Sequence, residues 1–511
     1  MAGISIGVIG GGASAVCLID ALAQAKGEPG SITVFEPSPH LWRGRAYQVD
    51  SECVKVNATP DDMSVRAGDP GHFERWLDGR TRLVGDGPAA DPFSGVRFAP
   101  RTVYGEYLEQ TAYAALAELR RQGWRVDLVG AAVTTARRIS GRVLLGTEHG
   151  ATDTFDYAVL CVGGDSPKDV YGLRGAPGFV PDPYPVTQKL RPVGPDESVA
   201  VIGSGLTAVD IVLSLVAQGH QGPISLLSRR GALPGVRQRP LPFQPRHLTQ
   251  ERMRELGRGR REMSLRELTD LVGREVREAG ADLDALYEEI TGLDREAPVD
   301  RLRRQFAAVD APDRGLRILQ HAVPDIGPDV WPLLREKDRA EILRSHYRTI
   351  MSLCCPMPPG SAAQLLDLVD AGRLEIRAGL GGVAGRPGGG FDAVLSDGSV
   401  VHARTVVNAV SASESRIPTR ALPLVNALVD SRAASPHPHG GLRLERATSR
   451  LVSAGLPDPR LYGLGTIGAG ALFFTFGVPS LVDRSVDIVA AILRHAATEN
   501  TAPARDALLP A

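Results

Sequence analysis

Two glycine turns in this chain have the residue types and spacing that bind the phosphates of a dinucleotide. The first turn covers residues 10–15, after an apolar run at 4–9 and before an apolar helix pattern at 16–22. Glycines at its first and third positions let the backbone turn sharply and approach a pyrophosphate, whose charge the N-terminus of the following helix stabilises. The predicted cofactor-binding residues of this turn are Gly10, Gly12, Ala13, Ser14 and Ala15.

The same order of elements occurs again in the middle of the chain. A strand pattern at 198–202 leads into a glycine turn at 203–208, a helix pattern at 209–215 and a strand pattern at 224–227. In both copies the polar residue that ends the second strand lies equally far from the first glycine (10 to 36, and 203 to 229). This full order of elements is far more specific than a lone glycine motif. The predicted cofactor-binding residues of the second turn are Gly203, Ser204, Gly205, Leu206 and Thr207.

The two strand ends carry opposite charges, which assigns a different nucleotide to each turn. Glu36 can accept hydrogen bonds from ribose hydroxyls, and its charge disfavours a 2′-phosphate. Arg229 and Arg230 can hold a 2′-phosphate in bidentate fashion. The alternative for these two arginines is a solvated turn. We therefore predict that the first turn binds FAD and the second binds NADPH.

Several further segments resemble a family of FAD/NAD(P)-binding proteins. They lie at residues 44–47, 56–65, 69–77, 100–108 and 228–231, and the resemblance is clearest up to about residue 235. The family includes bacterial L-aspartate N-monooxygenases and a type of FAD-dependent urate hydroxylase. Residues 462–470 also look like the closing FAD segment of this family, although an acidic residue common there is missing.

The resemblance implies an enzyme, namely a flavin-dependent monooxygenase that uses NADPH and O2. The expected reaction is hydroxylation of the amine of a small, aspartate-like amino acid through a flavin C4a-hydroperoxide, as part of secondary metabolism. A non-oxygenase flavin reductase or electron-transfer flavoprotein, a C-hydroxylase of a small heterocycle and a degenerate nucleotide-binding regulator remain as alternatives. Further FAD contacts are expected at Arg45, Ala46, Tyr47, Val133, Gly163, Gly465, Thr466 and Gly470.

Three residues of the segment at 56–65 are candidates for a place beside the flavin ring. Asn57 offers both a donor and an acceptor to flavin or NADPH atoms. Met63 and Ser64 could pack and hydrogen-bond near the ring. The alternatives are a turn residue for Asn57, which precedes Pro60, and a core residue for Met63.

Arginines after the second turn are candidates for binding the substrate. The segment at 236–247 contains three prolines together with Arg237, Arg239 and Arg246. Any of these side chains could clamp a carboxylate, as an amino-acid substrate requires. The alternative is a solvated loop.

Composition and charge exclude several other classes of protein. The 511 residues carry a net charge of -1, which removes the electrostatic case for binding nucleic acid or a membrane surface. The chain has no long apolar run and no signal-peptide pattern, so we expect a cytoplasmic protein. A monomer and a homo-oligomer both remain open. The five cysteines show neither zinc spacing nor the paired spacing of disulfide-reducing flavoenzymes, and no metal site is predicted.

The elements that position these residues predict an α/β fold with two Rossmann-like dinucleotide-binding domains. The FAD domain is expected at 1–190 and 391–495, interrupted by an NADPH domain at 197–390. Arg, Glu and spaced Leu residues predict a helical insertion at about 248–350 within the NADPH domain. Residues 496–511 are expected to form a tail.

Overall fold

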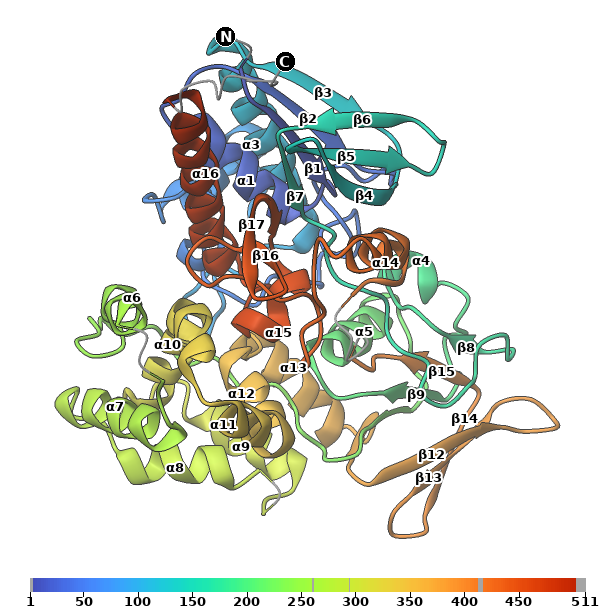
Figure 1. Ribbon diagram of the computed structural model, residues 1–511. Coiled ribbons are helices and arrows are strands. Elements are labelled where there is room, and N and C mark those ends of the chain that lie inside the picture. The colour runs from blue at the N-terminus through green and yellow to red at the C-terminus, as the bar shows by residue number, and fades with distance from the viewer. Residues whose placement is uncertain (1–2, 260–261, 294, 412–416, 502–511) are drawn as a thin grey trace, which may run out of the picture.

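The computed structural model describes residues 3–259, 262–293, 295–411 and 417–501, and it places them in two α/β units with a helical insertion (Figure 1). The first unit is built around a six-stranded sheet of order β16-β17-β7-β1-β2-β3, in which only β16 is antiparallel to its neighbour. Its strands are β1 (Ser5–Ile9), β2 (Ser31–Phe35), β3 (Arg125–Val129), β7 (Tyr157–Leu160), β16 (Arg450–Ser453) and β17 (Leu456–Gly463).

Different elements cover the two faces of this sheet. Three long helices pack on one face, because their apolar residues join β1, β2 and β7 in one core. A three-stranded antiparallel sheet packs on the other face, where a Cβ at Gly7 of β1 would lie 2.8 Å from the Leu145 side chain. The covering elements are α1 (Ala13–Gln24), α3 (Arg101–Arg121), α16 (Val478–Thr501), β4 (Val133–Ile139), β5 (Arg142–Thr147) and β6 (Thr152–Phe155); α2 (His72–Val84), α14 (Leu422–Asp430) and α15 (Ala469–Leu472) complete the unit.

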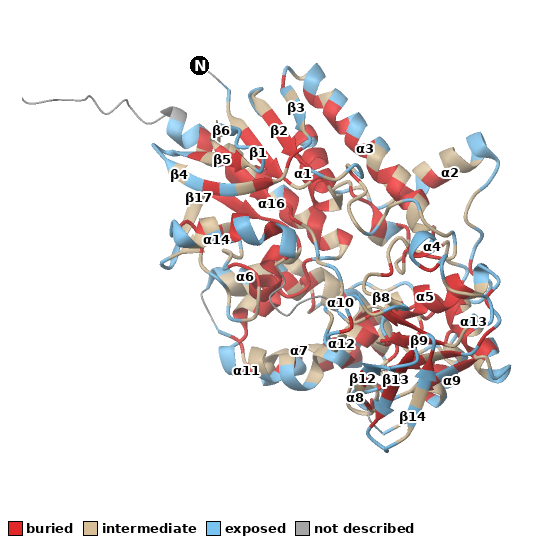
Figure 2. Ribbon diagram, turned by 90° about the vertical axis from the view of Figure 1, so that its right-hand side faces the viewer, coloured by how far each residue is buried: buried red, intermediate tan, exposed pale blue. Residues whose placement is uncertain are grey.

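The second unit repeats this plan with a five-stranded parallel sheet of order β11-β10-β9-β15-β8. Helices share a core with one face of the sheet and an antiparallel sheet shares a core with the other. The central strands of both sheets are largely buried, whereas edge strands such as β3 are more exposed (Figure 2). The elements are β8 (Phe179–Val180), β9 (Val199–Ile202), β10 (Ile224–Leu227), β11 (Leu374–Arg377), β15 (Thr405–Asn408), β12 (Leu380–Gly385), β13 (Phe391–Leu395), β14 (Val400–Ala403), α4 (Val186–Lys189), α5 (Leu206–Ala217) and α13 (Pro359–Asp370).

Between β10 and β11 the chain forms a group of helices, as the sequence predicts. Most of them share a core of their own, which also takes in Phe473 and Phe474 of the first unit. The helix Pro298–Ala307 instead packs into the core of the second unit through Leu302. The helices are α6 (Gln250–Arg258), α7 (Leu265–Glu278), α8 (Leu283–Thr291), α9 (Pro298–Ala307), α10 (Gly315–Val330), α11 (Glu336–Glu341) and α12 (Tyr347–Cys354). None of the helices within the described residues combines the length and the apolar character needed to cross a bilayer.

The predicted fold class is confirmed, but some predicted boundaries differ from the structure. The strands β8 and β15 both belong to the second sheet, so this unit includes residues 179–180 and extends beyond residue 391. The reason is that Val406 and Val407 are fully buried between β9 and β8. Helix α16 also continues to Thr501, past the predicted start of the tail at residue 496, and residues 502–511 lie outside the described residues.

Candidate dinucleotide and substrate site

The first glycine turn is shaped by close backbone contacts. Gly10 has a φ of 107°, and a Cβ there would lie 2.2 Å from the Cys161 carbonyl oxygen. Gly12 is the N-cap of α1 and supplies no capping side chain. The first N–H groups of α1 are therefore left for a ligand, and a helix N-terminus of this kind favours a phosphate group.

Glu36 lies at the end of β2 beside this turn and is 7% exposed. Its carboxylate accepts hydrogen bonds from the backbone N–H of Gly11 at 2.7 Å and of Ser38 at 2.9 Å. These bonds fix the carboxylate at the strand end. Because a carboxylate has more acceptor sites than two bonds use, Glu36 can also accept from ribose hydroxyls.

The C-terminal part of the chain returns to the same turn. Gly465 has a φ of 87°, and a Cβ there would lie 2.9 Å from the Ser14 hydroxyl oxygen. The Thr466 hydroxyl donates to the Gly163 carbonyl. The structure thus brings together four predicted FAD contacts from three distant segments. Gly470 lies at the edge of the helical insertion, since its carbonyl accepts from Trp331 Nε1 at 2.9 Å.

The remaining predicted FAD contacts are more dispersed. Arg45 pairs with Asp182 at 2.6 Å and lies over the Tyr184 ring, so it contacts the segment that leads into the second unit. Tyr47 packs on Tyr104, with ring centroids 4.7 Å apart. Ala46 is exposed, whereas Val133 is buried in β4.

The second glycine turn has the same construction as the first. Gly203 has a φ of 116°, and a Cβ there would lie 2.5 Å from the Ala409 carbonyl oxygen. Gly205 is the N-cap of α5, again without a capping side chain, and Leu206 and Thr207 open the helix. The buried Ser204 hydroxyl donates to the Ala232 carbonyl at 2.8 Å and so ties the turn to the segment that follows β10. The turn therefore fits a second pyrophosphate.

Arg229 and Arg230 follow β10 and are both exposed. Arg229 lies near Tyr171: burial raises the pKa of this phenol, and the positive charge of Arg229 opposes the increase. The two strand ends thus carry the opposite charges that the sequence predicts. Glu36 is buried at the first turn, and two exposed guanidinium groups stand at the second.

The segment predicted to lie beside the flavin ring is largely enclosed by protein. Met63 is 5% exposed, and its carbonyl accepts from the Tyr104 hydroxyl at 3.0 Å. The Ser64 hydroxyl donates to the Asp69 carbonyl at 2.7 Å. These contacts favour the core alternative for Met63. Asn57 is partly exposed and contacts the second unit through its carbonyl.

The three candidate substrate arginines do not converge. Arg237 donates to the Asn57 carbonyl, whereas Arg239 is exposed and pairs with Asp310 at 2.6 Å. Arg246 is also exposed and lies 3.6 Å from a carboxylate oxygen of Glu278 in α7. Arg237 and Arg239 both contact the first unit, Arg239 through the Phe93 carbonyl, but Arg239 also has a carboxylate partner in Asp310.

A buried ion pair that connects the two units was not predicted from the sequence. Arg101, at the start of α3, pairs with Asp210 of α5 at 2.8 Å, and the side chains are 14% and 7% exposed. The Tyr184 hydroxyl donates to Asp210 and accepts from Arg101. Burial disfavours the charge on Arg101, but Asp210 and Tyr184 outweigh it and raise the pKa of the guanidinium. The only signal in the sequence is an acidic residue inside an apolar helix pattern.

Breaking this pair is expected to destabilise the protein strongly. Arg101→Met should lower the free energy of unfolding by about 3–5 kcal/mol, because it leaves the Asp210 charge buried without a partner. Adding Asp210→Asn should recover part of the loss. Urea unfolding measures both effects. Arg121→Met, at an exposed pair with Glu118, is the matched control. An equal effect of the two single variants would contradict this interpretation.

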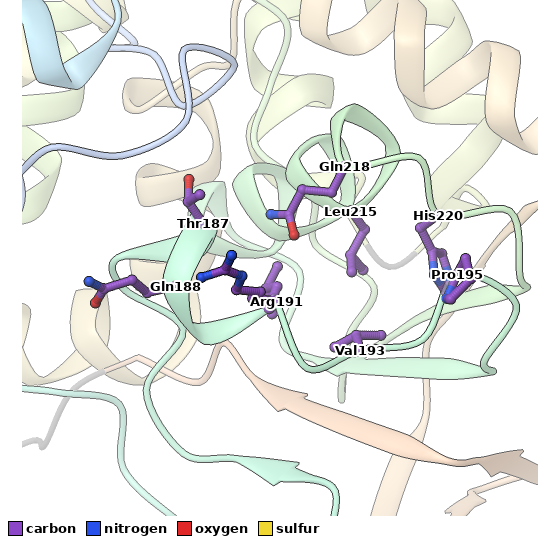
Figure 3. Close-up of a pocket in the computed structure, with 9 residues that line it drawn as sticks. Thr187, Gln188, Arg191, Val193, Pro195, Leu215, Gln218 and His220 are labelled. Carbon is purple, nitrogen blue, oxygen red and sulfur yellow. The ribbon is translucent and has the colours of Figure 1, made fainter.

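The second unit also contains a pocket of about 580 Å³ beside α4 and α5 (Figure 3). None of the residues predicted for either turn or for the substrate lines it. Its lining residues are Thr187, Gln188, Leu190, Arg191, Val193, Pro195, Leu215, Gln218 and His220.

Comparison with protein families supports a dinucleotide-binding domain at the first turn. The model of a family described as FAD-NAD(P)-binding matches residues 7–165, the part of the chain that holds the first turn, Glu36 and Gly163. No curated protein matches the sequence. The resemblance to FAD/NAD(P)-binding proteins drawn from the sequence is therefore confirmed for this part of the chain.

Solved structures resemble the chain over nearly its whole length. The ornithine hydroxylase of Pseudomonas aeruginosa is 16% identical, with a TM-score of 0.56 over 97% of this chain and 100% of that one. The L-lysine 6-monooxygenase of Pseudomonas syringae is 15% identical, with a TM-score of 0.57 over 96% and 99%. The ornithine N-hydroxylase of Kutzneria sp. 744 is 16% identical, with a TM-score of 0.54 over 97% and 100%. The chain thus has the fold of these flavin-dependent monooxygenases, with an FAD/NAD(P)-binding region at residues 7–165.

Proposed function

We propose that the protein is an FAD-dependent, NADPH-using monooxygenase that hydroxylates the amine of a small amino acid. The observation that carries this proposal is the pair of glycine turns, each with an uncapped helix N-terminus and with opposite charges at the strand ends. The fold supports it further, because similar structures include hydroxylases of ornithine and lysine and a cadaverine monooxygenase bound to FAD.

The protein's own residues would mainly bind and orient. The backbone N–H groups of α1 and α5 would each hold a pyrophosphate, Glu36 the ribose of FAD, and Arg229 with Arg230 the 2′-phosphate of NADPH. When bound, the two nucleotides supply the redox and oxygen chemistry. The protein needs no strong acid or base of its own, but it must hold the amine uncharged and keep water away.

The substrate is proposed to be aspartate-like rather than a long diamine. The sequence resemblance points to aspartate, whereas the similar structures are of enzymes named for ornithine, lysine and cadaverine. Arg237 adds a cation at the contact of the two units, which suits a carboxylate-bearing substrate.

A panel of amines tests the proposal. The FAD-loaded protein is incubated with NADPH and one compound at a time, including L-aspartate, L-ornithine, L-lysine and cadaverine, while NADPH loss, hydroxylamine formation and hydrogen peroxide are measured. We expect hydroxylamine from L-aspartate in near-stoichiometric ratio to NADPH. If every amine yields only hydrogen peroxide, or NADPH is not oxidised, the monooxygenase assignment is wrong and a reductase or a regulator is favoured.

A further inference from the structure

One guanidinium of the second unit is held rigidly against the first unit. Arg237 Nε and Nη2 both donate to the Asn57 carbonyl oxygen, at 3.1 and 2.7 Å. The backbone N–H of Arg237 donates to the Met357 carbonyl at 2.9 Å, and the N–H of Met357 donates to the Gly235 carbonyl at 2.7 Å. Both the main chain and one edge of the guanidinium are therefore fixed in place.

Arg237 is half-buried, and it lacks the carboxylate partner that a guanidinium withdrawn from water normally has. Within the described residues, no carboxylate oxygen lies within 4.0 Å of its nitrogens. Burial lowers the pKa of Arg237, and the nearby Asp62 carboxylate and Cys355 thiol only partly oppose this. Removing a charge from water is costly unless the charge is paired. The site therefore favours an anion that the protein itself does not supply.

Other arginines that are partly or fully buried show what is missing at this position. Arg66 pairs with Asp20 at 2.8 Å, Arg101 with Asp210 at 2.8 Å and Arg484 with Asp329 at 3.4 Å. Each of these pairs joins segments that are remote in the sequence and provides the guanidinium with a carboxylate. Arg237 instead contacts a neutral carbonyl.

The chemistry of the free edge specifies the ligand. A guanidinium carries more N–H donors than the two bonds to Asn57 use, and the donors lie in one plane. Two parallel N–H groups match the two oxygens of a carboxylate, which is why arginine binds this group in bidentate fashion. Because the Arg237 guanidinium is already fixed, it loses little further conformational entropy when it binds a carboxylate.

We propose that Arg237 anchors a carboxylate of the amino-acid substrate, and this inference rests on the proposed function. Neither neighbouring arginine is suited to the task, since Arg239 already pairs with Asp310 and Arg246 extends toward Glu278 in the insertion. Because Asn57 belongs to the first unit and Arg237 to the second, the anchored carboxylate lies where the FAD and NADPH units meet. The substrate therefore binds across both units.

Substitution of the guanidinium tests the anchor. In the FAD-loaded enzyme, Arg237→Gln should raise the KM for L-aspartate on the order of 100-fold and weaken its binding in calorimetry similarly, because two charge-assisted hydrogen bonds are lost. The kcat and the KM for NADPH should stay within about threefold, since the loss affects binding of the substrate alone. Arg237→Lys keeps the charge but lacks the planar guanidinium. Its KM for L-aspartate should therefore lie between those of the parent and of Arg237→Gln.

Arg303→Gln, at an exposed arginine of α9 that pairs with Asp370, should leave every parameter unchanged. The anchor is wrong if Arg237→Gln binds L-aspartate as well as the parent, if NADPH binding is weakened in its place, or if the parent protein binds no amino acid. Should the parent bind L-aspartate through Arg237 but form no hydroxylamine, the anchor stands and the proposed function fails. Arg237→Lys decides the matter if Arg237→Gln does not fold.

Discussion

The variants Gly12→Ala and Gly205→Ala are expected to lose different nucleotides while both remain folded. The two glycines are equivalent N-caps, of α1 and α5, and both have ordinary negative φ angles of -96° and -81°. A Cβ on Gly12 would lie 3.5 Å from the Gly44 Cα, an ordinary contact, and a Cβ on Gly205 would meet nothing within 4 Å. The added methyl group therefore disturbs the ligand and not the protein.

In each case the methyl group would occupy the space through which the backbone approaches a pyrophosphate. Gly12→Ala should purify without flavin, and Gly205→Ala should keep FAD but bind NADPH more weakly. We expect each variant to bind its nucleotide about 100-fold more weakly or worse. The reason is that losing even one charge-assisted hydrogen bond costs about 1.5–3 kcal/mol of binding free energy. Flavin absorbance, NADPH titration and circular dichroism measure FAD, NADPH and the fold. Both variants serve as controls for one another, and a common loss of one nucleotide, or no loss at all, contradicts the assignment.

The second large effect concerns the choice between NADPH and NADH. Replacing both Arg229 and Arg230 by serine should raise the KM for NADPH by about 10- to 100-fold, because charge-assisted bonds to the 2′-phosphate are lost. The KM for NADH should hardly change, since this nucleotide has no phosphate at that position. The preference is read from the two KM values in a flavin-reduction assay.

An exposed arginine far from the site separates this effect from a general loss of positive charge. Arg121→Ser removes a cation that pairs with Glu118 and should leave both KM values unchanged. A double variant that still prefers NADPH as strongly as the parent would show that the two arginines form a solvated turn.

The sequence predicts the parts of the fold whose patterns are local. Both glycine turns, and the strands and helices around them, appear where the order of apolar and glycine residues indicates. Some predicted domain boundaries differ from the structure, because the sequence pattern of a strand does not show which strands it pairs with. Val406 and Val407 read as a buried strand in either unit, and only their pairing with β8 and β9 places them in the second.

The site residues follow the same rule: those with partners nearby in the sequence could be placed, and those with remote partners could not. Glu36 lies at the turn as predicted, because its partners Gly11 and Ser38 are close in the sequence or in the same motif. The partners of the arginines are remote, so the sequence could not rank the three side chains. Arg237 reaches Asn57 across 180 positions, and Arg239 reaches Asp310 across 71.

A crystal structure of the protein with FAD and NADP+ tests the central claim most directly. The claim is that the opposite charges at two equivalent strand ends decide which nucleotide binds where, FAD at the first turn and NADPH at the second. We expect the FAD pyrophosphate at the N-terminus of α1 with its ribose hydroxyls on Glu36, and the 2′-phosphate of NADP+ within hydrogen-bond distance of Arg229 or Arg230. A first turn without flavin, or both guanidinium groups turned away from the phosphate, would contradict the claim.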